Sequence, residues 1–316
     1  MLRKPFTLSL VVPCYNEEEV LGATKEELSR LLSSLIEKGL IKKESFICFV
    51  DDGSKDRTWQ MIEEFSKEPH IKGLKLSRNC GHQNALLAGL FYVEGLCDAA
   101  VSLDADLQDD VSVVEQMCQK FTEGREIVYG VRKRRDTDTA FKRVTAEGFY
   151  KLMNWMGVDV VYNHADFRLM SKRALSWLKE FKEVNLFLRG IIPLLGLSSD
   201  TVYYDRKERF AGESKYPLKK MLAFAWDGIT SFSVVPLRFI TFLGVFVLII
   251  SLVLSVWALI SKLNGSAVSG WTSMMLIVLF LGGVQMLSLG IIGEYIGKIY
   301  KETKRRPRFF IEKIRD

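Results

Sequence analysis

The chain has 316 residues and a formal net charge of +6, from 44 lysines and arginines against 38 aspartates and glutamates. This length suits one large domain or two smaller ones, and so modest a charge does not by itself indicate nucleic-acid binding. The sequence has no zinc-finger spacing, RNA-binding signature or long basic tract, so no nucleic-acid partner is expected.

The first 131 residues alternate short apolar runs with helical patterns. Apolar runs predict five strands, at 8–12, 46–50, 73–76, 99–103 and 127–131. Helical patterns lie between them, at about 20–37, from Asp56 to 65, at 82–93 and at 111–121. Strands that alternate with helices predict a mostly parallel α/β sheet.

Polar clusters follow three of these predicted strands, at 13–17, 51–54 and 104–108. Because the carboxyl ends of parallel strands share one edge of the sheet, the three clusters should converge on a single site.

The third cluster has the composition of a divalent-metal site. Asp104 and Asp106 supply hard carboxylate oxygens, and Gln108 could add a carbonyl oxygen, so the set suits Mg²⁺ or Mn²⁺. An ion held here would bind an anionic group such as a diphosphate. The alternative is a solvated acidic turn or a run of helix N-caps, where aspartate is favoured.

The five cysteines give a different kind of information. Their number is odd and they form no CxxC pair, so a disulfide framework is not expected and this part of the chain should face a reducing compartment.

Two uncharged stretches near the C-terminus, 239–261 and 271–293, are each long enough to cross a bilayer. The alternative is two buried helices of a soluble protein. Arg238 precedes the first stretch, and basic residues follow the second: Lys298, Lys301, Lys304, Arg305, Arg306 and Arg308. The positive-inside rule then predicts a multi-pass protein of the cell (inner or plasma) membrane, with both ends cytoplasmic and a short loop outside. The second stretch is rich in glycine, which permits association of helices into a homo-oligomer.

The segments before these stretches carry amphipathic and basic patterns. Residues 218–229 have apolar residues at helical spacing and predict a helix on the membrane surface. Residues 186–195 predict either a second such helix or a buried core helix. Positive charge gathers at 132–143, 206–220 and 298–308, which fits an anionic substrate and anionic lipid head groups.

Several motifs together resemble known enzymes. Val12–Glu18 (VPCYNEE), Val50–Asp56 (VDDGSKD) and Asp104–Asp109 (DADLQD) resemble family 2 glycosyltransferases, which have the nucleotide-sugar-binding GT-A fold. Asp166–Ser171 (DFRLMS), Arg209–Tyr216 (RFAGESKY) and the two hydrophobic stretches extend the resemblance to polyprenyl-phosphate glycosyltransferases. It covers nearly the whole chain and is strongest to the bactoprenol glucosyltransferases, relatives of dolichol-phosphate mannose synthase.

The resemblance implies a Rossmann-like GT-A domain with interfacial helices and two C-terminal transmembrane helices. The expected division is a cytoplasmic catalytic domain at 1–180, interfacial helices with an acceptor loop at 181–235, the two spans within 236–300, and a basic cytoplasmic tail at 301–316.

The implied reaction is metal-dependent, inverting transfer of glucose from UDP-glucose to a polyprenyl phosphate such as undecaprenyl phosphate. The product would be a lipid-linked sugar for modifying cell-surface glycans. N-acetylglucosamine, galactose or an amino sugar stays open as the sugar. A processive polysaccharide synthase would have more spans and a Gln-x-x-Arg-Trp motif, and neither is present. A non-catalytic scaffold is the other alternative, against which the intact aspartates argue.

The resemblance also assigns roles to individual residues. Four match positions that hold the nucleoside, with the aspartate facing the base: Pro13, Tyr15, Glu17 and Asp52. Three match the metal and diphosphate site: Asp104, Asp106 and Gln108. Four match, or lie close to, basic groups that hold the acceptor phosphate: Arg132, Arg143, Arg209 and Lys215. For the basic residues, the alternative is ordinary surface charge in solvated loops.

Asp166 matches a carboxylate near the sugar that is proposed as a base, and with Asp106 it is an expected catalytic residue. A phosphate monoester has a second pKa of about 6 and is mostly a dianion at neutral pH, so it barely needs deprotonation. We therefore expect Asp166 mainly to orient or stabilise. The alternatives are a helix N-cap or a salt bridge with Arg168.

Overall fold

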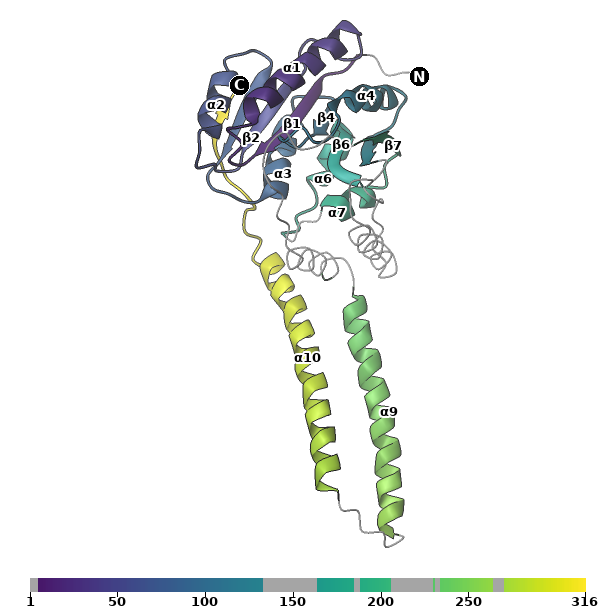
Figure 1. The fold of residues 1–316 in the computed structure, drawn as a ribbon. Helices are drawn as coiled ribbons and strands as arrows, with labels where there is room; N and C mark the ends of the chain where they lie inside the picture. Colours follow the sequence, from purple (N-terminus) through teal and green to yellow (C-terminus); the bar gives the residue numbers. More distant parts are fainter. Residues whose placement is uncertain (1–4, 133–163, 185–187, 206–229, 231–233, 264–269) are drawn as a thin grey trace.

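The strands of the N-terminal part form one sheet in the computed structural model, which describes residues 5–132, 164–184, 188–205, 230, 234–263 and 270–316. The strands are β1 (Leu8–Cys14), β2 (Phe46–Asp51), β3 (Ile71–Leu76), β4 (Ala99–Ser102), β5 (Ile127–Arg132), β6 (His164–Ser171), β7 (Ser199–Tyr204) and β8 (Ile311–Arg315). Their order across the sheet is β7-β5-β6-β4-β1-β2-β3-β8 (Figure 1). All five predicted strands are therefore present.

The sheet is mixed, because β6 runs antiparallel to both β4 and β5, and β8 runs antiparallel to β3. The central strands β4, β1, β2 and β3 are parallel to one another. Every residue of β1 and β2 is buried, as expected of parallel strands that helices cover on both faces.

Helices cover both faces of the sheet. One apolar cluster joins β1 to α1 (Leu21–Glu37), α2 (Thr58–Phe65) and α4 (Val114–Thr122), which follows a short 3-10 turn. The other cluster holds α3 (His82–Val93), α6 (Lys172–Leu178) and α7 (Leu188–Leu194). Along β1, Leu10 faces the first cluster and Val11 faces the second, because successive side chains alternate across a strand.

The helix α7 decides between the two predictions for residues 186–195. Leu188, Ile191 and Ile192 are buried in the second cluster, while Leu194 is exposed. The described part of this segment is thus a core helix and does not present a continuous apolar face to a membrane.

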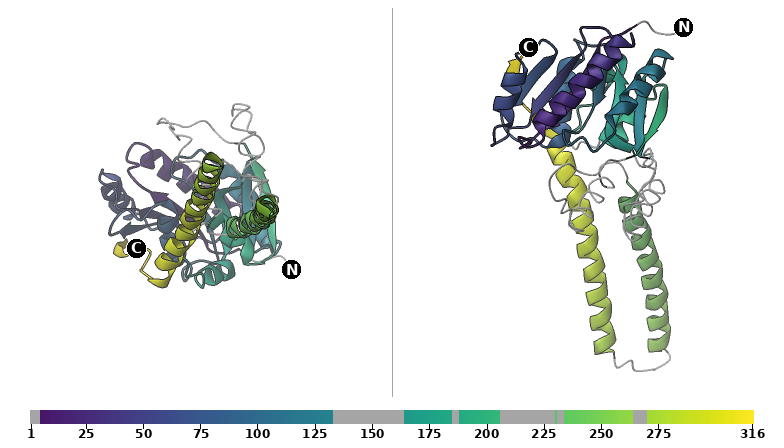
Figure 2. Two further views of the ribbon diagram at one scale, coloured as in Figure 1. Left: turned by 90° about the horizontal axis from the view of Figure 1, so that it is seen from below. Right: turned by 45° about the horizontal axis from the view of Figure 1, so that its top comes forward.

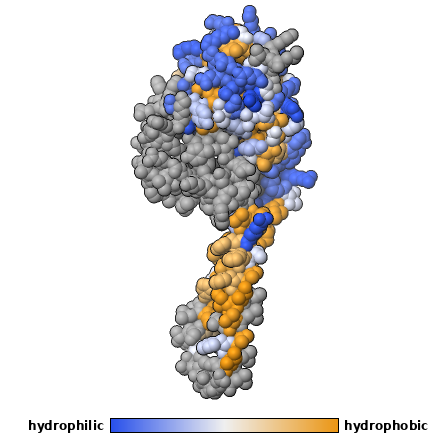
Figure 3. Space-filling model, turned by 90° about the vertical axis from the view of Figure 1, so that its right-hand side faces the viewer, coloured by the Kyte–Doolittle hydropathy of each residue, from blue (hydrophilic) through white to orange (hydrophobic). Residues whose placement is uncertain are grey.

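Two long helices, α9 (Val235–Leu263) and α10 (Trp271–Thr303), extend side by side away from the sheet domain (Figures 1 and 2). The uncharged stretches 239–261 and 271–293 lie within α9 and α10, and α10 continues to Thr303. On the face shown in Figure 3, the coloured surface of the long helices is mostly hydrophobic, whereas that of the sheet domain is mostly hydrophilic. Among the described residues, one segment, Phe280–Thr303, is long and apolar enough to cross a membrane. In α9 the described apolar stretch is shorter, Val235–Val247.

The strand β8 was not predicted from the sequence, which suggests only a basic tail at 301–316. β8 pairs with β3, and Arg315 binds Glu63 at 2.7 Å on the neighbouring helix α2. Lys72 and Lys75 of β3 reach Asp316 and Glu312 at 2.9 and 3.1 Å. The five residues of β8 are exposed and mostly charged, so no apolar pattern in the sequence indicates this strand. The sheet edge decides its structure because it offers unpaired backbone groups.

Candidate active site

The three polar clusters follow β1, β2 and β4, which are neighbours in the sheet. The pairing of β1 with β4 ends at Val11 and Ser102, and that of β1 with β2 ends at Cys14 and Asp51. The clusters therefore lie at one edge of the sheet, as the sequence predicts for parallel strands.

The loops after β1 and β2 are joined by hydrogen bonds. The Asn16 amide donates to Ser54 Oγ at 2.9 Å, and Asn16 Oδ1 accepts from the Lys55 amide at 2.9 Å. The Glu17 amide donates to Thr58 Oγ1 at 2.9 Å. Asn16 has φ of 54°, a conformation that asparagine tolerates better than most residues. The two loops thus form one unit. Tyr15 lies in this unit and is 40% exposed.

Asp52 fixes a third loop to this unit. Its carboxylate accepts hydrogen bonds from the Cys80 amide at 2.7 Å and the Gly81 amide at 2.9 Å, just before α3. The residue is buried, and this burial raises its pKa in spite of the two amides. Asp52 therefore positions the start of α3, which is a role that the sequence did not indicate. Its expected contact with a nucleobase stays a prediction.

Gly53 permits this close approach of the loops. Its φ is +68°, and a Cβ built on it would lie 2.6 Å from the carbonyl carbon of Arg78 and 2.7 Å from the amide of Asn79. We expect Gly53→Ala to lower the free energy of unfolding by at least about 1–2 kcal/mol from the backbone conformation alone. Thermal melting of the purified protein measures the change. Gly95→Ala is the matched control, because nothing lies within 4 Å of its Cβ position. An unchanged melting temperature for Gly53→Ala would contradict the prediction.

The acidic motif after β4 forms a strained turn. Leu107 has φ of 51°, which is uncommon for a branched apolar residue and is typical of functional sites. Asp106 Oδ1 accepts from the Gln108 amide at 3.2 Å. The Asp104 side chain is 41% exposed, and His82 Nε2 of α3 lies 3.5 Å from its Oδ1. Partial burial, together with the negative charges of Asp109, Asp166 and Asp106, raises the pKa of Asp104 to about 6.

His82 is a site residue whose role the sequence did not reveal. The available signal was the polar run 78–84, which follows the third predicted strand and so belongs to the same sheet edge. Its place at the site depends on the tertiary structure, because Asp52 holds the start of α3, which brings His82 close to Asp104.

The donor chemistry of this turn suits a hard divalent cation. Among the described residues, no three histidine, cysteine, aspartate or glutamate side chains form a ready-made metal cluster. The predicted set instead has two carboxylates, Asp104 and Asp106, and the amide of Gln108. Mg²⁺ is commonly held by one or two carboxylates, with waters and substrate phosphates as the other ligands. Burial and the crowding of negative charge both raise the pKa of Asp104, and a bound cation would relieve the crowding.

Arg132, at the end of β5, lies beside this motif. Its Nη2 donates to Asp109 Oδ1 at 3.0 Å and its Nε to the Tyr204 hydroxyl at 3.3 Å. Tyr204 donates to the same Asp109 oxygen at 2.6 Å. The guanidinium group is therefore held at the predicted edge. The other three predicted phosphate-binding residues lie outside the described part of the chain: Arg143, Arg209 and Lys215.

Asp166 lies on β6 and is held by two arginines. The register pairs Ser102, the last residue of β4, with Arg168, and Ser102 Oγ donates to the backbone carbonyl of Asp166, so Asp166 lies beside the end of β4. Asp166 accepts hydrogen bonds from Arg168 and from Arg189 of α7, the latter from Nη2 at 3.3 Å. Burial alone would raise the pKa of Asp166, but Arg189 and Arg168 outweigh it and hold this pKa well below its usual range. The predicted salt bridge between Asp166 and Arg168 is therefore present, whereas Asp166 lies within β6 and does not cap a helix.

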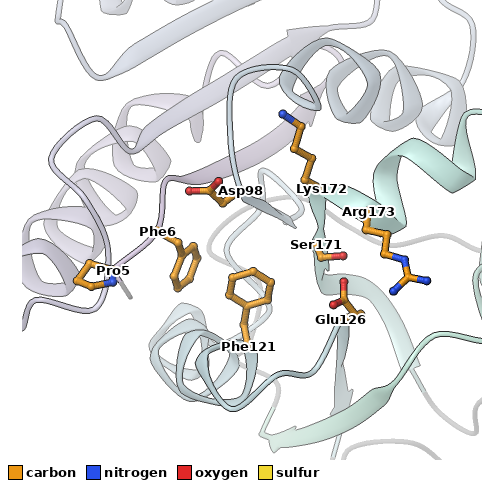
Figure 4. Close-up of a pocket in the computed structure, with 8 residues that line it drawn as sticks. All are labelled: Pro5, Phe6, Asp98, Phe121, Glu126, Ser171, Lys172 and Arg173. Carbon is orange, nitrogen blue, oxygen red and sulfur yellow. The ribbon is translucent and has the colours of Figure 1, made fainter. Parts of the chain in front are cut away.

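A cavity of about 370 Å³ lies at the other edge of the sheet (Figure 4). Phe6, Asp98 and Glu126 line it from the segments that precede β1, β4 and β5. It is therefore remote from the acidic motif and does not belong to this site.

Comparison with known proteins agrees with this architecture. Residues 9–178 match the family model described as Glycosyl transferase family 2, and residues 235–299 match the GtrB C-terminal hairpin. The chain belongs to glycosyl transferase family 2. It is a glycosyltransferase with the Rossmann-like α/β GT-A fold on a mixed sheet, followed by the GtrB-type hairpin.

Several curated relatives match over nearly their full length. The uncharacterized glycosyltransferase YkoT of Bacillus subtilis (strain 168) is 56% identical, covering 96% of this chain and 91% of that protein. A bactoprenol glucosyl transferase of Shigella phage SfX is 42% identical, covering 96% of this chain and 98% of that protein. A prophage bactoprenol glucosyl transferase homolog of Escherichia coli (strain K12) is 39% identical, covering 98% of this chain and 99% of that protein.

Proposed function

We propose that this glycosyltransferase transfers glucose from UDP-glucose to a polyprenyl phosphate, such as undecaprenyl phosphate, with inversion at the anomeric carbon. The observation that carries the proposal is the match to bactoprenol glucosyl transferases along nearly the whole chain, hairpin included. The lipid-linked glucose would then serve the modification of cell-surface glycans.

The donor would bind at the edge formed by β1, β2 and β4. The joined loops would hold the nucleoside through Pro13, Tyr15 and Glu17, with Asp52 at the base. Asp104, Asp106 and Gln108 would hold Mg²⁺ or Mn²⁺, whose chemistry when bound is to neutralise the charge that develops on the diphosphate as the bond to the sugar breaks.

The acceptor phosphate would supply the nucleophile. One of its oxygens forms the new bond to the anomeric carbon while the bond from that carbon to the diphosphate oxygen breaks, and the electron pair leaves with UDP. Because the phosphate is already mostly a dianion at neutral pH, no strong base is required. Asp166, ionised and paired with two arginines, is suited to positioning rather than to proton abstraction.

The hairpin would anchor the enzyme in the bilayer. Both α9 and α10 would span it, with the sheet domain and both termini on the cytoplasmic side and residues 218–229 at the interface. Glu302, at the end of α10, accepts the Val184 amide through both carboxylate oxygens at 2.8 and 2.9 Å, just before α7. This contact would keep the site close to the membrane surface, where the phosphate of a lipid acceptor lies. Association of copies through the spans stays a prediction.

Removal of divalent metal tests the reaction. Membranes that contain the protein are incubated with radiolabelled UDP-glucose and undecaprenyl phosphate, and label in the lipid fraction is counted. We expect label that depends on the acceptor, falls to background with EDTA and returns with excess Mg²⁺ or Mn²⁺. Parallel reactions with UDP-N-acetylglucosamine, UDP-galactose and GDP-sugars identify the donor. Absence of lipid-linked label with every donor would refute the proposal, and full activity in EDTA would refute its metal dependence.

A further inference from the structure

The chain that leaves α10 is attached to the sheet domain at two separate places. The first lies at the end of the helix, where Glu302 and Arg308 contact the segment 181–184 between α6 and α7. The second is β8, which pairs with β3 at the edge of the sheet (Figure 1). A single attachment can act as a hinge, whereas two separate attachments fix both the height and the tilt of the attached domain.

The first attachment holds the segment 181–184 from two sides. Glu302 accepts the Val184 amide through both carboxylate oxygens, at 2.8 and 2.9 Å. Arg308 Nη2 donates to the Phe181 carbonyl at 2.5 Å. Hydrogen bonds with a charged partner are stronger than neutral ones. We call Glu302, Arg308 and residues 181–184 together the clasp.

The charged side chains of the clasp form one electrostatic group. Burial raises the pKa of Glu183, and Glu302 raises it further while Arg308 lowers it. Burial lowers the pKa of Arg308, and Glu183 and Glu302 both oppose that shift. In a partly buried place, each of these charges depends on its partners, because removal of one leaves the others less well compensated. A change at Glu302 should therefore open the clasp as a whole.

The clasp lies next to the helix that reaches the candidate active site. The helix α7 begins four residues after Val184, and the amide of Leu188 donates to Gln83 Oε1 of α3 at 3.1 Å. Arg189, the next residue, forms an ion pair with Asp166 at 3.3 Å. The clasp thus attaches the end of α10 to the part of the domain that carries the candidate catalytic carboxylate.

We propose that Glu302 and Arg308 are positioning residues for the lipid acceptor, because the clasp and β8 together hold the sheet domain at one height and tilt above the bilayer. The inference rests on the proposed function, in which the acceptor phosphate is confined to the membrane surface. A water-soluble donor reaches the site in any orientation of the domain, whereas a phosphate at a fixed depth reaches it in one. If only a fraction of the molecules has that orientation, the apparent KM for the acceptor rises by the inverse of the fraction.

The test compares Glu302→Ala with the wild-type full-length protein reconstituted in lipid vesicles. Hydrogen–deuterium exchange of the peptide that contains Val184 reports whether the clasp is open. The KM for undecaprenyl phosphate is measured at saturating donor, and the KM for the donor at saturating acceptor. We expect faster exchange in this peptide and an acceptor KM about 5- to 10-fold higher, with the donor KM within about twofold of wild type.

Three further variants separate positioning from folding. Glu302→Gln keeps one oxygen that can accept the amide but loses the charge, so we expect a smaller rise of the acceptor KM. Arg308→Met keeps the apolar stem and removes the donor, so it should raise the same KM. Glu312→Ala is the matched control on the same tail, because Glu312 pairs with Lys75 at 3.1 Å outside the clasp. Such exposed pairs contribute little, so both KM values should stay unchanged. Melting temperatures establish that each variant is folded.

The proposal is overturned if exchange rises in folded Glu302→Ala while the acceptor KM stays within about twofold of wild type. It is also overturned if exchange does not change, if only kcat falls, or if both KM values rise together. If the wild-type protein transfers sugar and one of these results is obtained, this inference fails and the proposed function stands. If the wild-type protein transfers no sugar to polyprenyl phosphate, the proposed function itself fails, and the inference fails with it.

Discussion

Replacing Asp104 with asparagine should lower the rate of sugar transfer by about 100-fold or more. The substitution keeps the shape of the side chain but removes one of two carboxylates expected to hold the divalent cation. Such a cation contributes several kcal/mol by stabilising charge in the transition state, and each 1.4 kcal/mol corresponds to about tenfold in rate.

Initial rates with saturating donor, measured over a range of Mn²⁺ concentrations, check this expectation. The loss should shrink as Mn²⁺ is raised if weaker metal binding is its cause. Asp110→Asn is the control, because Asp110 lies in the same acidic run but caps the following turn by accepting from the Ser112 amide at 3.2 Å. Asparagine caps about as well as aspartate, so transfer should stay close to the wild-type rate. A folded Asp104→Asn protein with nearly full activity would remove the acidic motif from the proposed mechanism.

Replacing Asp166 with asparagine should lower the free energy of unfolding by about 3–5 kcal/mol, more than any other substitution considered above. The substitution leaves Arg168 buried with no carboxylate, next to a second positive charge on Arg189. Removing one partner of a buried ion pair costs this much because the other charge remains uncompensated. The melting temperature should fall by roughly 10 °C.

Two comparisons identify charge as the cause. Asp200→Asn, which breaks a part-exposed pair with Lys120, should cost no more than about 1 kcal/mol. Adding Arg168→Met to Asp166→Asn should recover part of the loss, because it removes the excess buried charge. A double variant that is less stable than Asp166→Asn by the full cost of Arg168→Met would contradict this explanation.

The sign of the pH dependence follows from the lowered pKa of Asp166. A carboxyl group whose pKa falls on folding stabilises the folded state above its unfolded pKa of about 3.9. This contribution is lost only as the pH falls below that value towards the folded pKa. The difference in stability between wild type and Asp166→Asn should therefore be constant near neutral pH and shrink in acid.

The folded fraction of Asp166→Asn should retain measurable turnover. The acceptor phosphate needs no strong base, so loss of the Asp166 carboxylate should lower the rate of transfer without abolishing it. Complete loss of transfer with intact UDP binding would instead indicate that Asp166 acts as the base.

The sequence determined the parts of the molecule whose structure depends on local pattern. Five apolar runs predicted β1 to β5, and helical spacing predicted α1 to α4. Such elements can be predicted because their buried side chains recur at a fixed spacing in the sequence. Polar clusters after three of the strands predicted a site at one sheet edge. The acidic motif could also be recognised in the sequence, because paired aspartates directly after a buried strand are typical of a divalent-metal site.

Only the tertiary structure decided which residues from distant segments meet. β8 follows no apolar alternation, and the positions of β6 and β8 in the sheet come from pairing with β4, β5 and β3. Asp52 turned out to hold the loop before α3, and that loop brings His82 to Asp104. The pairing of Asp166 with Arg189 joins residues 23 positions apart on a strand and a helix. Ion pairs and hydrogen bonds of this kind depend on distances of a few ångströms between elements, and a linear pattern of residue types does not contain those distances.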